Sequence, residues 1–420
     1  MIGHRELDSA TTLVRPVDAY ERLFYRFAER NPAHFAIVAE FDTVVAAGRV
    51  RPALDAVQRR HPLLSVHVED RPDTRLGFYR ARDAAPVDLT VRHNAESSWD
   101  GVLAEELARP FDRSRAPLMR ACLVRGREWS ALLLVFDHTI ADGISSVFVL
   151  GDVLAAMNGQ ALPPLPEPPS QEHLTARMLG AIAPSDSALL DDPRMHMPST
   201  FRPFDGAPPN VHTLTMADVD TAMLAQRCRA ERTTVHAALV VAMCRVRATE
   251  QAESFVRALN PINFRALIGV KGDCGLYFQS AQTGWSSDGA PFWEQARAIT
   301  ASMDDARSPR GILALSLGVQ GAMTVGAGTD VAEDVFGRVS PWELLISNLG
   351  VQNLDGSGPL RPKAVWGPAV QSQTAGEYAT GITTYEGRLR IVACGYSVPA
   401  TFLKGVADEL AAAVEERDQP

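Results

Sequence analysis

The sequence predicts a mixed α/β protein built as two lobes of related architecture. Helical and strand patterns alternate through the first 157 residues, and they alternate again from residue 211 to residue 420. Between these stretches, residues 158–210 carry 11 of the 28 prolines, a density that excludes long helices and central strands. We therefore predict an N-terminal lobe at 1–157, a crossover segment over the surface at 158–210, and a C-terminal lobe at 211–420.

Apolar spacing predicts the elements of the N-terminal lobe. Helices are predicted at 18–29, 52–60 and 99–108, and strands at 36–41, 64–68, 117–124 and 131–136. The last of these strands is almost continuously apolar, which is typical of a strand buried on both faces.

The C-terminal lobe shows the same mixture of patterns. A helix is predicted at 235–246, where the apolar residues recur at helical spacing along one side. Further helices are predicted at 292–303 and 402–414, and strands at 343–346 and 389–393.

Composition excludes several classes of protein. The formal net charge of −9 argues against a nucleic-acid partner, because phosphate binding needs clustered cationic side chains. No apolar run reaches the roughly 20 residues of a membrane-spanning helix, and residues 1–10 do not resemble a secretory signal. The five cysteines are scattered and odd in number, which is typical of reduced thiols in a cytoplasmic protein.

The sharpest local signal is the segment from Phe136 to Ile144, where a buried strand ends, a histidine follows and a helix begins. Loops at strand ends commonly present catalytic groups, and a histidine there can take a proton from an alcohol or an amine. His138 is therefore the candidate general base. A structural histidine in a loop is the plainer alternative, and Asp142 could serve only as the N-cap of the following helix. Gly143 is expected to permit a tight turn.

Other chemistries find little support. His138 and Asp142 could share a metal, but no third ligand stands nearby and no H-E-x-x-H spacing occurs. The G-x-S-x-G elbow of serine hydrolases is absent, and no phosphate-binding or dinucleotide-binding loop is present. We predict neither a metal nor a cofactor.

The segment His138 to Gly143 matches the H-x-x-x-D-G motif of the condensation-domain and chloramphenicol-acetyltransferase-like superfamily, which the chain resembles over residues 60–350. Further matches follow in family order: Arg60-His61-Pro62-Leu63-Leu64, Pro110-Phe111-Asp112, Pro117-Leu118-Met119-Arg120, Asn260-Pro261-Ile262-Asn263-Phe264-Arg265, Gly275-Leu276-Tyr277-Phe278 and Ser347-Asn348-Leu349-Gly350. Length and order are most similar to the stand-alone, polyketide-associated acyltransferases of the phthiocerol dimycocerosyl transferase type.

Two features depart from the family pattern. Asp137 stands where the family usually has a first histidine, and neighbouring side chains on a strand point to opposite faces. Asp137 is therefore expected to hold the loop by accepting backbone hydrogen bonds, not to touch substrate. The C-terminal half also lacks a D-F-G-W-like segment, which argues against a plant-type or multimodular member.

The resemblance implies two chloramphenicol-acetyltransferase-like lobes, each an α+β two-layer sandwich, which form a pseudo-dimer around a central tunnel. It implies an acyltransferase, of the class that transfers groups other than aminoacyl groups. A donor thioester on coenzyme A or on a phosphopantetheinyl carrier protein would enter one side, and a small-molecule or polyketide acceptor the other. His138 would be the base, and Ser347 or Asn348 could bind the oxyanion, although a strand-end turn is their plainer role. No cofactor is needed, and we expect a monomer.

By the same resemblance Asp142 would pair with Arg265 of the second lobe and so hold the loop that carries His138, with Gly143 beside it. Two rival functions stay open. One is a carrier-dependent, amide-forming condensation enzyme, since the same base serves a hydroxyl or an amine. The other is a non-catalytic docking module of the same fold. If a carrier docks, the acidic net charge requires a local basic patch, for which Arg245, Arg247 and Arg257 are the candidates.

Overall fold

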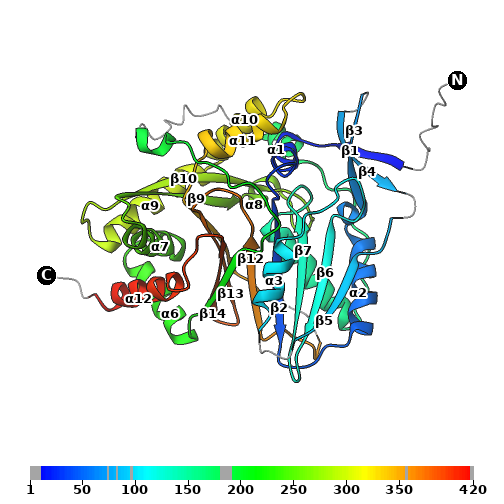
Figure 1. Cartoon of the computed structure of the whole chain (residues 1–420), viewed down its shortest axis with the longest axis horizontal. Coiled ribbons are helices and arrows are strands. Elements are labelled where there is room, and N and C mark those ends of the chain that lie inside the picture. Colours follow the sequence, from blue (N-terminus) through cyan, green and yellow to red (C-terminus); the bar gives the residue numbers. More distant parts are fainter. Residues whose placement is uncertain are drawn as a thin grey trace.

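Two large sheets lie side by side in the computed structural model (Figure 1), which describes residues 11–72, 75–81, 84–94, 98–179, 192–354 and 358–416. The first sheet has the strand order β12-β2-β7-β6-β5. Its strands are β12 (Ala364–Val370), β2 (His34–Phe41), β7 (Ser130–Asp137), β6 (Met119–Arg125) and β5 (Asp88–His93). The second sheet has the order β10-β9-β11-β13-β14-β8. Its strands are β10 (Phe278–Ser286), β9 (Phe255–Asn263), β11 (Leu344–Val351), β13 (Tyr378–Tyr385), β14 (Arg388–Gly395) and β8 (Asn210–Thr215).

A small antiparallel sheet and the helices complete the fold. The small sheet has the order β1-β4-β3, with β1 (Thr11–Pro16), β4 (Arg75–Ala81) and β3 (Val66–Arg71). The helices of the first half are α1 (Ala19–Phe27), α2 (Ala47–Arg60), α3 (Asp100–Leu107), α4 (Gly143–Met157) and α5 (Gln171–Leu179). Those of the second half are α6 (Asp218–Ala230), α7 (Val235–Gln251), α8 (Arg265–Ile268), α9 (Phe292–Arg307), α10 (Pro309–Ala322), α11 (Thr329–Asp334) and α12 (Phe402–Glu415). Three short turns are η1 (Pro62–Ser65), η2 (Pro193–His196) and the π-helical η3 (Val335–Val339).

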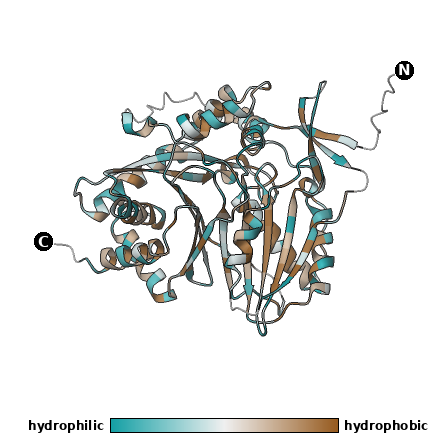
Figure 2. Cartoon of the chain, in the orientation of Figure 1, coloured by the Kyte–Doolittle hydropathy of each residue, from teal (hydrophilic) through white to brown (hydrophobic). Residues whose placement is uncertain are grey.

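The first sheet is buried on both faces, as the apolar run in β7 predicts. Alternate residues of β7, Leu132, Leu134 and Phe136, share a core with α2 and α4. The intervening Leu133 and Val135 pack in a second core with α3 and with β14 of the second sheet. Figure 2 shows apolar residues concentrated along these strands. The predicted mixed α/β architecture of two lobes is confirmed.

Several element boundaries differ from the sequence-based expectation. Helix α2 begins at Ala47, five residues before the predicted start, so Pro52 lies inside it. Val50 is completely buried in the core, and this packing outweighs the backbone hydrogen bond that the proline lacks. The predicted strand at 64–68 begins only at Val66, because Pro62 to Ser65 form the turn η1. Strand β11 runs past the predicted end to Val351, with an irregular register after Asn348.

One strand crosses the predicted lobe boundary. Strand β12 belongs to the range 211–420, yet it pairs antiparallel with β2 in the first sheet (Figure 1). It fits there because residues 364–369 are all buried. The chain thus ties the lobes together, because β12 pairs along the length of β2 and also packs against β13 and β14 of the second sheet.

The proline-rich segment touches both halves of the molecule. Leu165 N donates to Arg60 O, Arg15 Nε donates to Pro168 O, and Tyr277 Oη donates to Pro169 O. The segment includes the nine-residue helix α5, and its residues 180–191 lie outside the described part of the chain, as do residues 1–10. All five cysteines are buried and unpaired.

Gly381 on β13 is required where β12 crosses β13. A Cβ atom at this position would lie 1.9 Å from the carbonyl oxygen of Pro368. We expect Gly381→Ala to lower the free energy of unfolding by about 1–3 kcal/mol, because the backbone of β12 would have to move. Gly318→Ala on α10, where a Cβ meets nothing within 4 Å, is the matched control and should be neutral or stabilising. Equal urea midpoints for the two variants would contradict this account.

Glu377, in the loop between β12 and β13, is a buried carboxyl, and no described group hydrogen-bonds to its Oε1 atom. Burial raises the pKa of Glu377 to about 8, against opposing effects that include the positive charges of Arg247 and Arg202. Between pH 4.5, its ordinary pKa, and pH 8, the unfolded chain releases a proton that the folded chain keeps. Stability therefore falls as the pH rises through this window.

We expect Glu377→Gln to abolish this pH-dependent loss of stability. The melting temperature of the variant, relative to that of the wild type, should therefore rise as the pH is raised from 5 to 8. Glu294→Gln, at an exposed position on α9, is the control and should follow the wild type. Parallel melting profiles for Glu377→Gln and the wild type across this range would show that Glu377 titrates normally in the folded protein.

Candidate functional site

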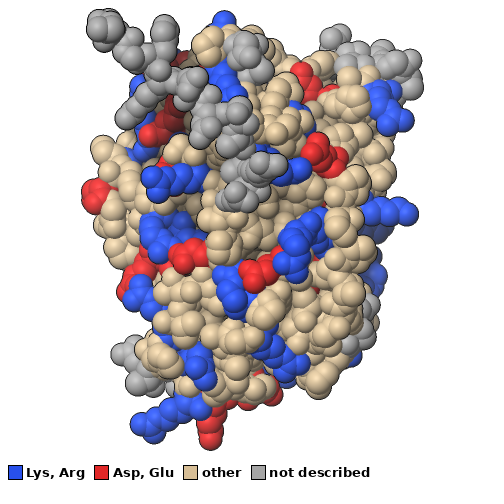
Figure 3. Space-filling view, turned by 90° about the vertical axis from the view of Figure 1, so that its right-hand side faces the viewer, with Lys and Arg blue, Asp and Glu red and all other residues tan. Residues whose placement is uncertain are grey.

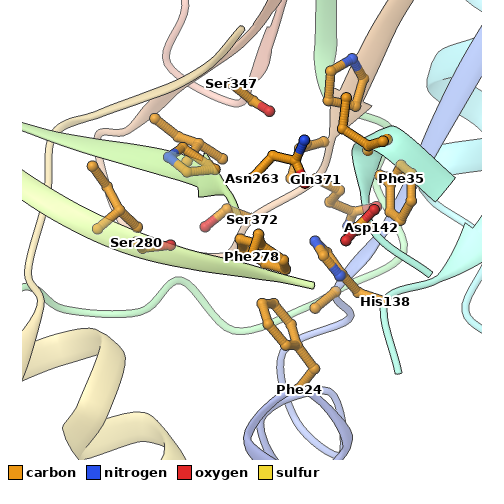
Figure 4. A pocket seen from close by; sticks show the side chains of 18 of the residues that line it. Phe24, Phe35, His138, Asp142, Asn263, Phe278, Ser280, Ser347, Gln371 and Ser372 are labelled. Atoms are coloured by element: carbon orange, nitrogen blue, oxygen red, sulfur yellow. The ribbon is translucent and has the colours of Figure 1, made fainter. Parts of the chain in front are cut away.

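A single cavity at the lobe boundary brings the predicted site residues together (Figure 4). The space between protein atoms here amounts to about 1140 Å³, which includes solvent open to the outside. The predicted residues in its wall are His138, Asp142, Gly143, Arg265, Ser347 and Asn348. The first three come from the first lobe and the others from the second, so the site exists only when the two lobes are joined.

His138 follows directly after β7, and its backbone is held on both sides. His138 N donates to Ala33 O, and Asp137 N donates to Leu118 O. Asp137 Oδ1 accepts from Thr139 N at 2.9 Å, and Asp137 is 2% exposed. Asp137 therefore holds the loop in the way predicted for it.

The His138 ring lies among three aromatic rings. Its centroid is 4.1 Å from that of Phe24, 4.9 Å from that of Phe35 and 5.5 Å from that of Phe278. Burial lowers the pKa of His138, and the nearby carboxylates of Asp142 and Asp137 oppose this effect only in part. The imidazole is therefore neutral near pH 7, the form in which it can accept a proton.

Asp142 is both an N-cap and an ion-pair partner, so the two alternatives for this residue hold together. Its Oδ1 accepts from Ser145 N at 2.8 Å, and Asp142 is thereby the N-cap of α4. The guanidinium of Arg265 meets both carboxylate oxygens at 2.9 Å, and both residues are buried. Tyr277 N donates to Oδ2 at 2.8 Å. The carboxylate thus holds the start of α4 against Arg265 and Tyr277 of the second lobe.

The segment before β10 strengthens this contact between the lobes. Ser145 Oγ donates to Gly275 O at 2.7 Å and accepts from Gly275 N at 3.0 Å. Arg265 also donates to Ser145 Oγ, at 2.8 Å. The beginning of α4 is therefore bound to the second lobe through one continuous hydrogen-bond network.

Gly143 has a different role from the predicted one. It does not have a positive φ, so no tight turn requires a glycine there. A Cβ atom would instead lie 2.8 Å from Leu349 Cδ2 and 3.4 Å from Pro368 Cγ. Glycine allows β11 and β12 to approach the start of α4 closely.

The two candidates for an oxyanion contact differ in their surroundings. Asn348 Oδ1 accepts from Gly350 N at 2.8 Å and so supports the turn at this point of β11. The Ser347 hydroxyl lines the cavity and has no hydrogen-bond partner among the described residues. Figure 4 shows Ser347 across the cavity from His138. The bond from Gly350 N uses only the amide oxygen of Asn348, so Asn348 Nδ2 and the Ser347 hydroxyl are both donors without a partner among the described residues.

The predicted docking arginines are not a surface patch. Arg247 is 4% exposed and binds Glu253 and Gly376 O, while Arg257 is 6% exposed and pairs with Glu343. Arg245 is partly buried and donates to Gln295 and Ala290 O. Because these guanidinium groups already have partners inside the second lobe, the proposed basic patch is wrong. On the face seen in Figure 3, Lys and Arg side chains lie beside Asp and Glu.

Sequence reasoning missed much of the cavity wall. Phe24, Phe27 and Phe336 line it, although they come from α1 and η3, far from His138 in the chain. Apolar spacing marks Phe24 as a buried helix residue but says nothing of what it faces. Ser280, Trp342 and Gln371 also line the cavity, and no motif singled them out.

Within the described ranges, no group of three or more His, Cys, Asp or Glu side chains is arranged to hold a metal ion. Over the same ranges, no helix is both long and apolar enough to cross a bilayer.

Comparison with known proteins gives a family match for part of the chain. Residues 25–177 match the family model of the condensation domain. The chain is 33% identical over 143 residues to phosphinothricin tripeptide synthetase PhsC of Streptomyces viridochromogenes, which covers 29% of this chain and 12% of that protein. It is 33% identical over 116 residues to surfactin synthase subunit 2 of Bacillus subtilis, which covers 27% of this chain and 3% of that protein. The chain thus spans a small part of these relatives.

Solved structures match along nearly the whole chain. Polyketide synthase associated protein 5 of Mycobacterium tuberculosis superposes with a TM-score of 0.68 at 16% identity, over 96% of this chain and 98% of that one. The first condensation domain of the CDA synthetase also gives 0.68, at 15% identity and over 97% of both chains. At these identities the likeness shows the fold, and it extends through both lobes.

Proposed function

We propose that this chain is a member of the condensation-domain superfamily that transfers an acyl group from a thioester to a hydroxyl or an amine; the family match of residues 25–177 and the fold of both lobes support this. The observation that carries the proposal is the cavity between the lobes, which joins a neutral histidine on one side to a free hydroxyl donor on the other. Either coenzyme A or a phosphopantetheinyl carrier protein would present the donor.

The proposed reaction begins with His138. The acceptor hydroxyl or amine gives its proton to the imidazole as its oxygen or nitrogen bonds to the thioester carbonyl carbon. The carbonyl oxygen becomes an oxyanion, to which the Ser347 hydroxyl or Asn348 Nδ2 donates a hydrogen bond. The intermediate then breaks its carbon–sulfur bond, and the leaving thiolate takes the proton from His138. An ester or an amide and a free thiol are formed, and the base is regenerated.

This reaction needs no bound cofactor, because the thioester is already activated and the protein mainly has to position two substrates. The Asp142–Arg265 pair would contribute by holding the loop that carries His138 against the second lobe. The nucleophile of the acceptor decides between ester and amide products.

A panel of donors and acceptors tests the proposal. Acyl-CoA thioesters of increasing length and the same acyl groups on a carrier protein would each be incubated with an alcohol and with an amine. Release of free thiol together with a product whose mass equals acceptor plus acyl group is the expected result. Donor binding by calorimetry with neither thiol nor product for any pair would overturn the proposal and favour the docking module.

A further inference from the structure

The ring of Phe24 covers one face of the His138 imidazole. The two rings are nearly parallel, with 14° between their planes and 4.1 Å between their centroids (Figure 4). Phe35 and Phe278 meet the imidazole at larger angles, 53° and 31°. Phe24 is therefore the one of these three that lies face to face with the proposed base.

We infer that Phe24 is a positioning residue for His138, whose ring plane it sets and one of whose faces it shields from water; the inference rests on the proposed function. Nδ1 of His138 is buried and has no hydrogen bond of good geometry to any described group. A second hydrogen bond is what usually fixes the orientation of a catalytic imidazole. Backbone hydrogen-bonding groups of His138 and Ala141 also act on the ring, but none meets Nδ1 with good geometry, so packing shares in holding the ring. Of the three ring contacts, only Phe24 is stacked nearly parallel to the imidazole.

Phe24 is itself held firmly. The centroid of its ring lies 5.6 Å from the ring centroids of both Tyr20 and Phe336, and 5.9 Å from that of Phe278. Helix α1 has a capping box, in which Asp18 accepts from Glu21 N and Glu21 accepts from Asp18 N. The Arg22 guanidinium then donates to Met323 O of the second lobe at 2.5 Å and to Val17 O at 3.0 Å. The position of Phe24 is therefore fixed relative to both lobes.

The charged groups around the imidazole are few. The carboxylates of Asp142 and Asp137 come from its own segment, and Asp142 is paired with Arg265 of α8. The phenol of Tyr20 on α1 contacts the Phe24 ring and is uncharged, because burial raises its pKa. The rings from β2 and β10 are uncharged. Burial is the main cause that lowers the pKa of His138. Removal of the Phe24 ring admits water and should therefore move this pKa up towards the ordinary value of 6.5.

The test compares Phe24→Leu with Phe24→Tyr and with Phe402→Leu. Leucine removes the flat ring, whereas tyrosine keeps it. Phe402 lies in the core of the second lobe against Tyr378, so its variant controls for the loss of one buried ring. The pH dependence of kcat is measured for each, and the His138 ring is titrated by NMR in each folded protein.

In Phe24→Leu we expect kcat to fall about ten- to hundredfold, as for a misplaced base, and the acid midpoint to move to higher pH. The NMR titration of His138 should move in the same direction, while Phe24→Tyr and Phe402→Leu should keep the wild-type midpoint. An unchanged midpoint and an unchanged NMR titration in folded Phe24→Leu would overturn the inference. If the wild type transferred no acyl group at all, the proposed function would fail, but the NMR titration would still decide the role of Phe24.

Discussion

His138→Ala is expected to reduce acyl transfer by about 10²–10⁴-fold, the usual contribution of a general base. The physical reason is that no other described side chain in the cavity wall could take a proton near neutral pH: Asp142 is held by Arg265, Ser145 and Tyr277. The measurement is thiol release under saturating donor and acceptor, with circular dichroism to show that the variant is folded.

Two further variants make this result decisive. The imidazole packs among three rings, so alanine leaves a gap, and His138→Gln is included because it fills more of that space. His93→Ala, at an exposed position of β5, should retain full activity. Turnover close to that of the wild type in folded His138→Ala and His138→Gln would rule out His138 as the base.

The second large effect is expected at the Asp142–Arg265 pair. Removal of either partner leaves a buried charge without its counterion, and we expect Asp142→Asn and Arg265→Ala each to lower the free energy of unfolding by about 3–5 kcal/mol. Asparagine can still accept from Ser145 N as a cap. Its amide would, however, face the donors of Arg265 and Tyr277, so capping alone does not rescue the variant.

A double-mutant cycle measures the coupling between the two residues. The double variant should be less destabilised than the sum of the single variants, because neither charge is left alone. The exposed pair Lys404–Asp408 on α12 is the control, and its cycle should give less than about 1 kcal/mol. Additive effects at Asp142 and Arg265, with Asp142→Asn nearly silent, would leave Asp142 as a helix cap alone.

Local sequence determined the strand and the helix on either side of the His138 to Gly143 motif. The continuous apolar run that ends at Phe136 predicts a doubly buried strand, and β7 has alternate residues in two cores. The predicted start of a helix after Asp142 is also found, with Asp142 as its N-cap. Such features follow from residues close together in the chain, since strand burial and helix capping depend on neighbours a few positions away.

The resemblance to a family also predicted one contact between residues far apart in the chain, the pair Asp142 and Arg265. Arg265 could be placed opposite Asp142 only because two separate segments match the family pattern in order. From physical chemistry alone, Asp142 was as well explained as a cap, and the structure shows that it is a cap and an ion-pair partner at once.

What the sequence by itself determined is therefore the local part: two α/β lobes, a buried strand that ends at a histidine, and a capped helix after it. Only the tertiary structure decided that Phe24 covers His138, that β12 joins the first sheet, that Gly143 serves close approach, and that Arg247 and Arg257 are buried. The reason is physical. Helix and strand patterns report which face of an element is buried, but not what it is buried against, and that depends on how two lobes distant in sequence meet.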